Sequence, residues 1–283
     1  MKVALVQTNP QDNWKDNLLR AAGFIAEAAQ SGAQVVVLPE MFSFMGSESE
    51  RLALASPLEK GDFAWLSGVA RYYGVVLVGG SAGESVIDHD AHGSQHLTER
   101  IFNTHQTFAA DGSVLFTYRK VHLFNLRAAD GSSEFRESSW CRRGEAPSSG
   151  FDVVVGTELW RALTLICYDL RFPEIFRVPV LRSAPPDVVF LPAAFTYRTG
   201  KDHWEVLLRA RAIENQCFVV ACNQTGTFAG GTKRHYGHSM VVSPWGNILL
   251  QCGEDEGVGY AELDLAEIRR VRDTLPALQN RIL

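Results

Sequence analysis

The sequence predicts an α/β protein in which two mixed β-sheets carry helices on their outer sides. Strand-like runs at 2–8 and 34–39 flank a helical segment at 14–31, which is the pattern of a parallel crossover unit. The pair Asp111-Gly112 separates two strand-like runs, a strong signal of an antiparallel hairpin. A second strand–helix–strand pattern spans 187–222. Parallel units and hairpins thus alternate without a low-complexity linker, and we expect one domain over residues 1–283.

The first half of the chain supplies the first crossover unit and the first hairpin. The runs at 2–8 and 34–39 are rich in Val and Leu, as is typical of buried strands. Between them, apolar residues recur at helical spacing: Leu18, Ala21, Ala22, Ile25 and Ala28. The other elements expected here are a helix at 60–73 and strands at 75–79, 101–109 and 113–118.

The second half repeats this alternation. Pro173 follows the predicted strand 161–167 and suits the first position of a helix. The other elements expected here are helices at 201–215 and from about 265, and strands at 151–155, 187–191, 217–222, 238–243, 247–251 and 258–263. The loops 84–100 and 125–150 exceed usual connection lengths, so they are candidates for lids or substrate-facing segments.

Composition narrows the class of protein. A net charge of −5 and a pI near 5.9 argue against a nucleic-acid partner. No apolar run reaches 18 residues, so we expect no membrane span, and the N-terminus lacks the features of a signal peptide. Five cysteines without a CxxC pair favour reduced thiols and the cytoplasm. The histidines and aspartates of 88–96 suggest a metal site, but a polar Gly/Ser segment without orienting elements favours a solvated loop.

Cys167 is the first candidate catalytic residue. Its apolar segment, ALTLICYDLRFPE, turns charged directly after the thiol, so we expect Cys167 at the carboxyl end of a strand, on a sharp turn. Backbone N–H groups at such a turn can hold a developing oxyanion. The alternative is a buried, inert cysteine, as most core cysteines are.

Glu40 and Lys120 are the next candidates. The strand VVVLPE ends at Glu40, which can act as a general base if burial raises its pKa; the alternative is an exposed glutamate that opens a loop. Lys120 stands between apolar residues in FTYRKVHLF. Its compact positive charge can stabilise a thiolate and a tetrahedral oxyanion; the alternative is a solvated lysine on an edge strand.

Three short segments together resemble the signatures of the nitrilase superfamily, the carbon–nitrogen hydrolases. In chain order they are LPEMF (38–42), YRKVHLF (118–124) and ICYDLRFPE (166–174). The resemblance extends over nearly the whole chain, from KVALVQTNP at the start to GHSMVVSPWG at 237–246. It implies a four-layer αββα sandwich with two mixed sheets. It also implies a homodimer or larger homo-oligomer, in which residues 173–184 form part of the interface or pack within the chain.

The resemblance also assigns the site. It implies a Glu–Lys–Cys triad formed by Glu40, Lys120 and Cys167, with Glu137 of the segment FRES (135–138) as a supporting carboxylate. The backbone N–H of Tyr168 is expected to assist Lys120 in holding the oxyanion. These side chains supply the nucleophile, the acid/base and the oxyanion donor, so we expect no metal and no organic cofactor.

The segments 199–226 and YGHSM (236–240) resemble the Nit-like amidase branch, which includes omega-amidases and deaminated-glutathione amidases. That branch implies a small amide of a 2-oxo acid as substrate. Arg171 is similar to an arginine that binds the substrate carboxylate in related carbamoyl-amino-acid hydrolases. The alternative for Arg171 is a structural ion pair with Asp169 or Glu174.

The expected reaction is amide hydrolysis through a thioester on Cys167, with release of ammonia. Two alternatives use the same triad, an N-carbamoyl-amine hydrolase and a nitrilase, and the shape of the pocket decides between them. A catalytically silent scaffold that binds a partner is the alternative from another class. Intact Glu, Lys and Cys at all three motif positions argue against the scaffold.

Overall fold

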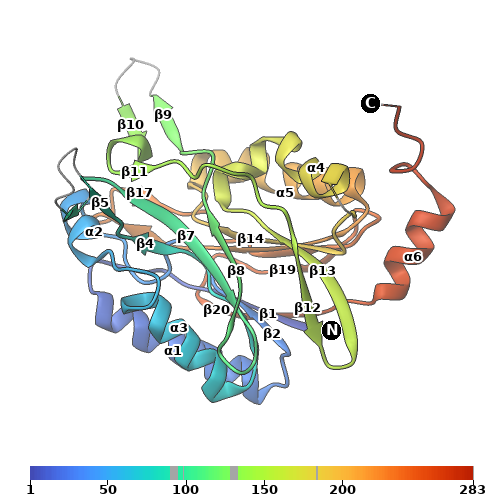
Figure 1. Cartoon of the computed structure of the whole chain (residues 1–283), viewed down its shortest axis with the longest axis horizontal. Helices are drawn as coiled ribbons and strands as arrows, with labels where there is room; N and C mark the ends of the chain where they lie inside the picture. Colours follow the sequence, from blue (N-terminus) through green and yellow to red (C-terminus); the bar gives the residue numbers. More distant parts are fainter. Residues whose placement is uncertain (90–94, 98, 128–132, 183, 283) are drawn as a thin grey trace.

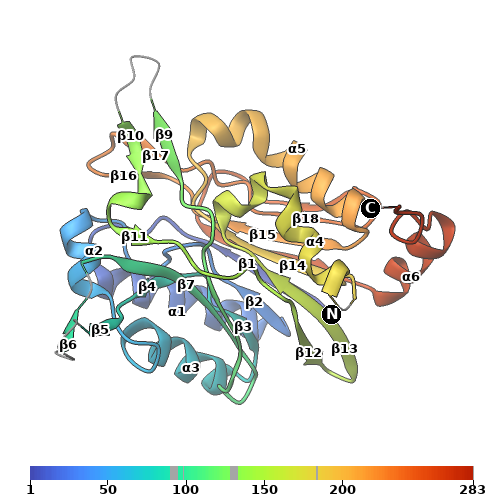
Figure 2. The same cartoon turned by 45° about the horizontal axis from the view of Figure 1, so that its top comes forward.

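The computed structural model describes residues 1–89, 95–97, 99–127, 133–182 and 184–282. Two large mixed sheets pack face to face, and helices cover their outer sides (Figure 1). Helices α1 and α3 cover one sheet, and α4 and α5 cover the other (Figure 2). The structure therefore confirms the predicted four-layer αββα sandwich.

The first sheet has the strand order β11-β7-β3-β2-β1-β20, and β4 and β8 also pair with β7. Strands β1, β2 and β3 run parallel, whereas β20 is antiparallel to β1 and β8 is antiparallel to β7. The strand bounds are β1 Lys2–Gln7, β2 Val35–Val37, β3 Val76–Val78, β4 Ala82–Glu84, β7 Ile101–Phe108, β8 Val114–Arg119, β11 Cys141–Arg142 and β20 Gly257–Glu262.

The second sheet has the order β12-β13-β14-β15-β18-β19. Its central strands β13, β14 and β15 are parallel, and antiparallel pairs complete both edges. The strand bounds are β12 Phe151–Val155, β13 Glu158–Thr164, β14 Val188–Ala193, β15 Phe218–Asn223, β18 Met240–Val242 and β19 Ile248–Gln251.

The helices include all five that the sequence predicts and one that the periodicity does not show. Their bounds are α1 Trp14–Gln30, α2 Glu48–Leu54, α3 Gly61–Tyr73, α4 Pro173–Arg182, α5 Tyr197–Asn215 and α6 Leu265–Thr274. Pro173 is the first residue of α4, as expected. Among the described residues, every helix is too short or too polar to cross a bilayer.

Successive side chains of a strand point to opposite faces of its sheet, and the buried ones form three layers of hydrophobic core. In β1, Val3 and Leu5 face the second sheet, whereas Ala4 and Val6 face α1 and α3. In β14, Val188 and Phe190 lie between the sheets, and Val189 packs toward α4 and α5. Strands with both faces buried are nearly continuously apolar, which is why their pattern shows no polar side.

The prediction that 84–100 and 125–150 are long loops is wrong, because both segments contain paired strands. The segment 84–100 includes the hairpin of β5 Ile87–His89 and β6 Gln95–Leu97. The segment 125–150 includes the pair β9 Asn125–Arg127 and β10 Ser133–Arg136, the short helix η1 Glu137–Ser139 and strand β11. A third small pair, β16 Thr227–Phe228 and β17 Lys233–Arg234, follows the second sheet's β15.

Candidate active site

A cavity of about 800 Å³ opens where the two sheets meet, and it is lined by Glu40, Lys120, Glu137 and Cys167. Each of these residues follows a strand or belongs to a short helix. Glu40 comes shortly after β2, and Lys120 directly follows β8. Cys167 begins the short helix η2 Cys167–Arg171 after β13. The structure thus brings together four predicted site residues that lie far apart in the sequence.

Lys120 is the centre of a buried ion network. Its Nζ donates to Glu40 Oε1 at 2.7 Å and to Glu137 Oε2 at 2.8 Å. The Lys120 side chain is only 2% exposed and those of Glu40 and Glu137 are 6% and 7% exposed, so one positive charge lies between two carboxylates away from water. Removing one partner of such a buried group leaves an uncompensated charge, which typically costs about 3–5 kcal/mol.

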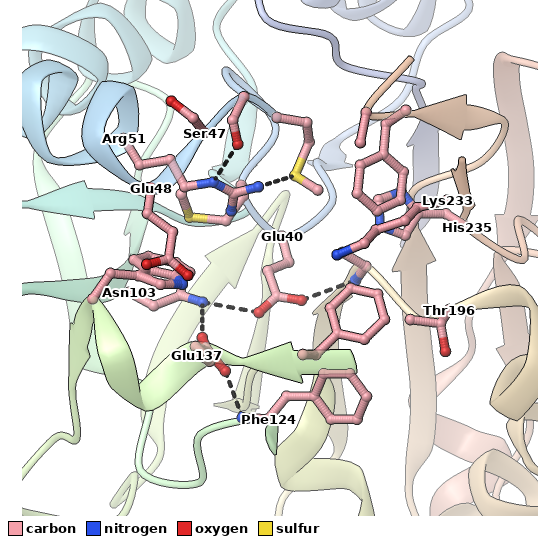
Figure 3. A pocket seen from close by; sticks show the side chains of 18 of the residues that line it. Glu40, Ser47, Glu48, Arg51, Asn103, Phe124, Glu137, Thr196, Lys233 and His235 are labelled. Carbon is pink, nitrogen blue, oxygen red and sulfur yellow. Dashed lines mark hydrogen bonds between the residues drawn. The ribbon is translucent and has the colours of Figure 1, made fainter. Parts of the chain in front are cut away.

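Backbone and amide donors hold both carboxylates in place (Figure 3). Asn103 Nδ2 donates to Glu40 Oε1 at 2.9 Å and to Glu137 Oε1 at 3.1 Å. The backbone N–H of Ala194 donates to Glu40 Oε2 at 2.9 Å, and that of Phe124 donates to Glu137 Oε2 at 2.6 Å. With several donors each, the carboxylates have little freedom to rotate.

The electrostatics of the network define the resting state. Burial by itself lowers the pKa of Lys120, but the charges of Glu137 and Glu40 outweigh it and raise that pKa well above its ordinary value. Burial and the neighbouring Glu40 carboxylate raise the pKa of the Cys167 thiol well above its ordinary value, although Lys120 opposes this shift. At neutral pH the site therefore holds an ammonium ion and a neutral thiol.

Cys167 occupies a strained turn. Its φ of 47° lies in the left-handed region, which a residue other than glycine adopts at a cost of about 1 kcal/mol or more. Strand β13 ends at Thr164 rather than at residue 167, so the predicted strand runs three residues too far. The turn holds the thiol at the cavity wall, and the cysteine is 7% exposed.

The buried carboxylate of Asp169 stabilises this turn. It accepts from the backbone N–H of Ile166 at 3.0 Å and from the Tyr118 hydroxyl at 2.8 Å. The backbone N–H and Nδ1 of His122 lie at 3.1 and 2.7 Å from the same carboxylate. Asp169 therefore links the nucleophile turn to the segment that carries Lys120.

Arg171 lies in a small side pocket that also touches Cys167 and Tyr168. Its guanidinium stands over the rings of Phe195 and Tyr168, and its Nη1 lies 3.2 Å from His203 Nδ1. The carboxylate of Asp169 is bound to Tyr118 and His122 instead, and within the described residues Arg171 forms no ion pair with Asp169 or Glu174. Substrate binding by Arg171 stays a prediction.

Asn103 was not predicted as a site residue, although the sequence around it carries a signal. Five consecutive polar residues, 103–107, stand inside the fully buried strand β7. Buried polar side chains need hydrogen-bond partners, so such a run marks a strand that serves a polar site. The contributions of the Ala194 and Phe124 backbone N–H groups carry no such signal, because every residue type supplies a backbone donor.

The metal alternative at 88–96 lies largely outside the described residues, which exclude 90–94. Within the described part of the chain, no three His, Cys, Asp or Glu side chains form a group suited to a metal ion.

Comparisons with known proteins agree with this geometry. The family model described as carbon–nitrogen hydrolase matches residues 2–273. The chain is 37% identical over 286 residues to a deaminated glutathione amidase of Synechocystis, covering 99% of this chain and 97% of that protein. It is 34% identical to the human omega-amidase NIT2, covering 99% and 94%.

Solved structures show the same relationship. The crystal structure of Saccharomyces cerevisiae Nit3, a member of branch 10 of the nitrilase superfamily, superimposes with a TM-score of 0.83 at 32% identity, covering 100% of this chain and 97% of that one. The C. elegans NitFhit structure gives a TM-score of 0.82 at 33% identity, covering 99% of this chain and 65% of that one. This chain therefore belongs to the carbon–nitrogen hydrolase family and is an amidohydrolase of the nitrilase superfamily.

Proposed function

We propose that this enzyme hydrolyses a 2-oxo-acid amide through a thioester on Cys167, with Glu40 as acid/base, Lys120 as oxyanion donor and Glu137 as supporting carboxylate. The observation that carries the proposal is the buried network in which Lys120 binds both Glu40 and Glu137 beside the Cys167 thiol. A nucleophile, a base and a fixed positive charge that line one cavity are the requirements of acyl transfer.

Acylation begins with a neutral thiol. Glu40 accepts the Cys167 proton as the sulfur attacks the amide carbon, because both groups line one cavity and Glu40 is the carboxylate that acts on the thiol. The tetrahedral oxyanion is held by the Lys120 ammonium and the backbone N–H of Tyr168. Glu40 then gives the proton to the leaving nitrogen, the carbon–nitrogen bond breaks, and a thioester remains on Cys167.

Deacylation reuses the same groups. A water takes the place of the departed amine, Glu40 removes its proton, and the oxygen attacks the thioester carbon. The second oxyanion collapses, the carboxylic acid leaves, and Cys167 regains its proton from Glu40. Throughout the cycle Glu137 compensates the Lys120 charge, so that Lys120 stays protonated when Glu40 is transiently neutral.

The substrate class is proposed from the relatives and from Arg171. The relatives named above are a deaminated glutathione amidase and an omega-amidase. Arg171 lies next to Cys167 in the side pocket, where a guanidinium can bind the carboxylate of the acyl part. A 2-oxo acid bears such a carboxylate, which a simple nitrile or an uncharged amide lacks.

The test is turnover of four compounds: 2-oxoglutaramate, deaminated glutathione, a carbamoyl-amine and a simple nitrile. We expect hydrolysis of an oxo-acid amide and a loss of at least roughly a thousandfold in Cys167→Ala. Cys252→Ala, which removes a thiol away from the cavity, is the matched control and should keep its activity. Turnover of only the carbamoyl compound or the nitrile would move the substrate class to those alternatives, and turnover of none would favour the scaffold.

Assembly and location are further parts of the proposal. We propose that residues 1–283 act as one domain and that the chain forms a homodimer or larger homo-oligomer through α4 and α5. Val206 on α5 is 67% exposed, which supports an interface there, whereas Ile175 and Phe176 of α4 pack within the chain. A solution mass equal to one chain would contradict it. All five cysteines are free, which supports the proposed cytoplasmic location.

A further inference from the structure

Three adjacent parallel strands of the second sheet end near the cavity, and a residue that bears on the site follows each of them. Cys167 comes after β13, Ala194 directly after β14 and Gln224 directly after β15. The carboxyl ends of neighbouring parallel strands lie at one edge of a sheet, where binding sites of such sheets form. The thiol of Cys167 and the N–H of Ala194 already have a place in the site, whereas the side chain of Gln224 has no part in the proposed reaction.

Gln224 binds the backbone of the proposed acid/base residue. Its Nε2 donates to the carbonyl of Glu40 at 2.6 Å and to that of Met41 at 3.3 Å. Gln224 is fully buried, so these hydrogen bonds form away from water, where a lost partner is costly. Glu40 follows a strand of the first sheet and Gln224 a strand of the second. The contact therefore ties the base to the sheet that carries the nucleophile.

The turn that Gln224 binds is strained. Met41 has a φ of 47°, in the left-handed region that residues other than glycine adopt only at a cost. Such a conformation persists where the surrounding structure holds it. The N–H of the peptide between Glu40 and Met41 donates to the Ser81 hydroxyl at 3.0 Å, and the carbonyl of the same peptide accepts from Gln224. Both polar groups of this peptide are therefore fixed by side chains.

The end of β15 also acts on the Glu40 carboxylate. Glu40 Oε2 accepts from the N–H of Ala194 at 2.9 Å. Asn223, the residue before Gln224, accepts from the N–H of Phe195 at 2.8 Å and so holds the segment that carries the Ala194 donor. Figure 3 shows the Glu40 side chain extending into the pocket. A shift of the Glu40 backbone would move the carboxylate away from these fixed donors.

We propose that Gln224 is a positioning residue, which fixes the backbone of Glu40 so that its carboxylate can exchange a proton with Cys167. Gln224 binds a backbone carbonyl, so it acts on the reaction through Glu40 and not by contact with the reacting atoms. The inference rests on the proposed role of Glu40 as acid/base. It implies that loss of the Gln224 amide lowers kcat and leaves KM nearly unchanged.

The first test is Gln224→Met, which keeps the length of the side chain and removes its amide donors. We expect kcat for the oxo-acid amide to fall about ten- to hundredfold, with less than about a threefold change in KM, because proton transfer requires fixed geometry. Gln216→Met is the matched control. Gln216 is equally buried, precedes the opposite end of β15 and donates through its Nε2 to the carbonyl of Leu275. Equal kcat values for the two variants would overturn the proposal.

Gln224→Glu provides a readout that a loss of packing would not move. A neutral carboxyl group can still donate one hydrogen bond to the Glu40 carbonyl, whereas an ionised one cannot. The charged groups bound at this turn are the Glu40 carboxylate and, through it, Lys120. We expect burial beside Glu40 to raise the pKa of the introduced carboxyl.

The kcat of Gln224→Glu relative to the wild type should therefore be high near pH 5 and should fall toward that of Gln224→Met at about pH 8. The same ratio for Gln224→Met should not change with pH. A ratio for Gln224→Glu that is constant over this range would show that hydrogen-bond donation at position 224 is not required.

Crystal structures of Gln224→Met and Gln216→Met keep this inference separate from the proposed function. We expect Glu40 Oε2 to lose its contact with the N–H of Ala194 in Gln224→Met only. If the wild type hydrolyses none of the amides but Glu40 moves in Gln224→Met, the proposed function fails and the positioning role stands. If Glu40 keeps its contacts in that variant, the positioning role is wrong whatever the enzyme hydrolyses.

Discussion

At the scale of single residues, Asn103 determines how the two carboxylates of the site face each other. One amide nitrogen donates to Glu40 and to Glu137, so a single side chain fixes the orientation of both. Both of these bonds go to carboxylates, and neither goes to the thiol. We therefore treat Asn103 as a positioning residue.

Replacing Asn103 by leucine should lower kcat about ten- to hundredfold with a small change in KM. A carboxylate that has lost a donor is protonated more readily, so the acid limb of the kcat profile should move to higher pH. Gln106→Leu is the matched control, because it removes a buried amide from the same strand without touching the carboxylates. If the acid limb of the kcat profile stays at the same pH in Asn103→Leu, Asn103 does not position the carboxylates.

His105 makes the stability of the protein sensitive to acid. Its Nδ1 lies 2.7 Å from the carbonyl of Gly80 and its Nε2 2.7 Å from the Thr107 hydroxyl, and the ring is fully buried. Burial lowers its pKa to about 4, below the value of about 6.5 in an unfolded chain. The unfolded state therefore binds more protons between these values, so stability is present above pH 6.5 and is lost as the pH falls toward 4.

Between pH 7 and pH 5 this one group should remove about 2 kcal/mol from the free energy of unfolding. His105→Gln should be less stable at pH 7 but should lose that part of the pH dependence. Urea denaturation at the two pH values measures both quantities. Identical pH dependence in the wild type and the variant would show that another group carries the effect.

At the scale of elements, the turn η2 carries the nucleophile and depends on Asp169. The carboxylate accepts from the backbone before the turn, from Tyr118 in β8 and from His122 after β8, so it joins two elements that meet at the cavity. Asp169→Asn places an amide nitrogen among these donors. We expect it to lower the free energy of unfolding by about 1–3 kcal/mol and to lower kcat, because the Cys167 turn loosens.

Asp152→Asn is the control for this change. Asp152 pairs with Arg161 at 3.1 Å on β12, and its side chain is 53% exposed, so its loss should cost less than about 1 kcal/mol. Denaturation and steady-state kinetics on both variants provide the comparison. If Asp169→Asn behaves like Asp152→Asn, the turn does not need the buried carboxylate.

At the scale of the whole molecule, the site is divided between the two sheets. Glu40 and Lys120 follow strands of the first sheet, whereas Cys167 and the N–H of Ala194 follow strands of the second. Gln224, after β15, also donates to the carbonyl of Glu40 at 2.6 Å. The distance between thiol and carboxylate therefore depends on how the sheets pack.

Two large-to-small substitutions in the hydrophobic core test whether the packing of the sheets controls the site. Leu5 lies between the sheets and Ile25 lies between α1 and the first sheet, and both are fully buried. Leu5→Ala and Ile25→Ala should each cost about 2–5 kcal/mol of stability. At a temperature where both variants are folded, we expect Leu5→Ala to lower kcat more. Equal kcat values would show that sheet packing does not control the site.

Local sequence patterns were enough to predict most strands and helices of this protein and its family. Strands and most helices follow from periodicity, and the family follows from three motifs at strand ends, since both signals lie within a few neighbouring residues. Helix α2 was not predicted, because it is short and has no buried residue. Its capping box, formed by Ser47 and Glu50, was the one sequence signal of a helix start there. The strands within 84–100 and 125–150 were not predicted, because they are only two to four residues long.

Only the tertiary structure decided which groups surround the proposed triad. Asn103 meets a carboxylate 63 positions away, and the N–H of Ala194 meets the same carboxylate across 154 positions. Gln224 meets the backbone carbonyl of Glu40 across 184 positions. Sequence pattern reports which face of an element is buried, whereas the partners across two packed sheets depend on register and on the angle between layers, which no local window contains.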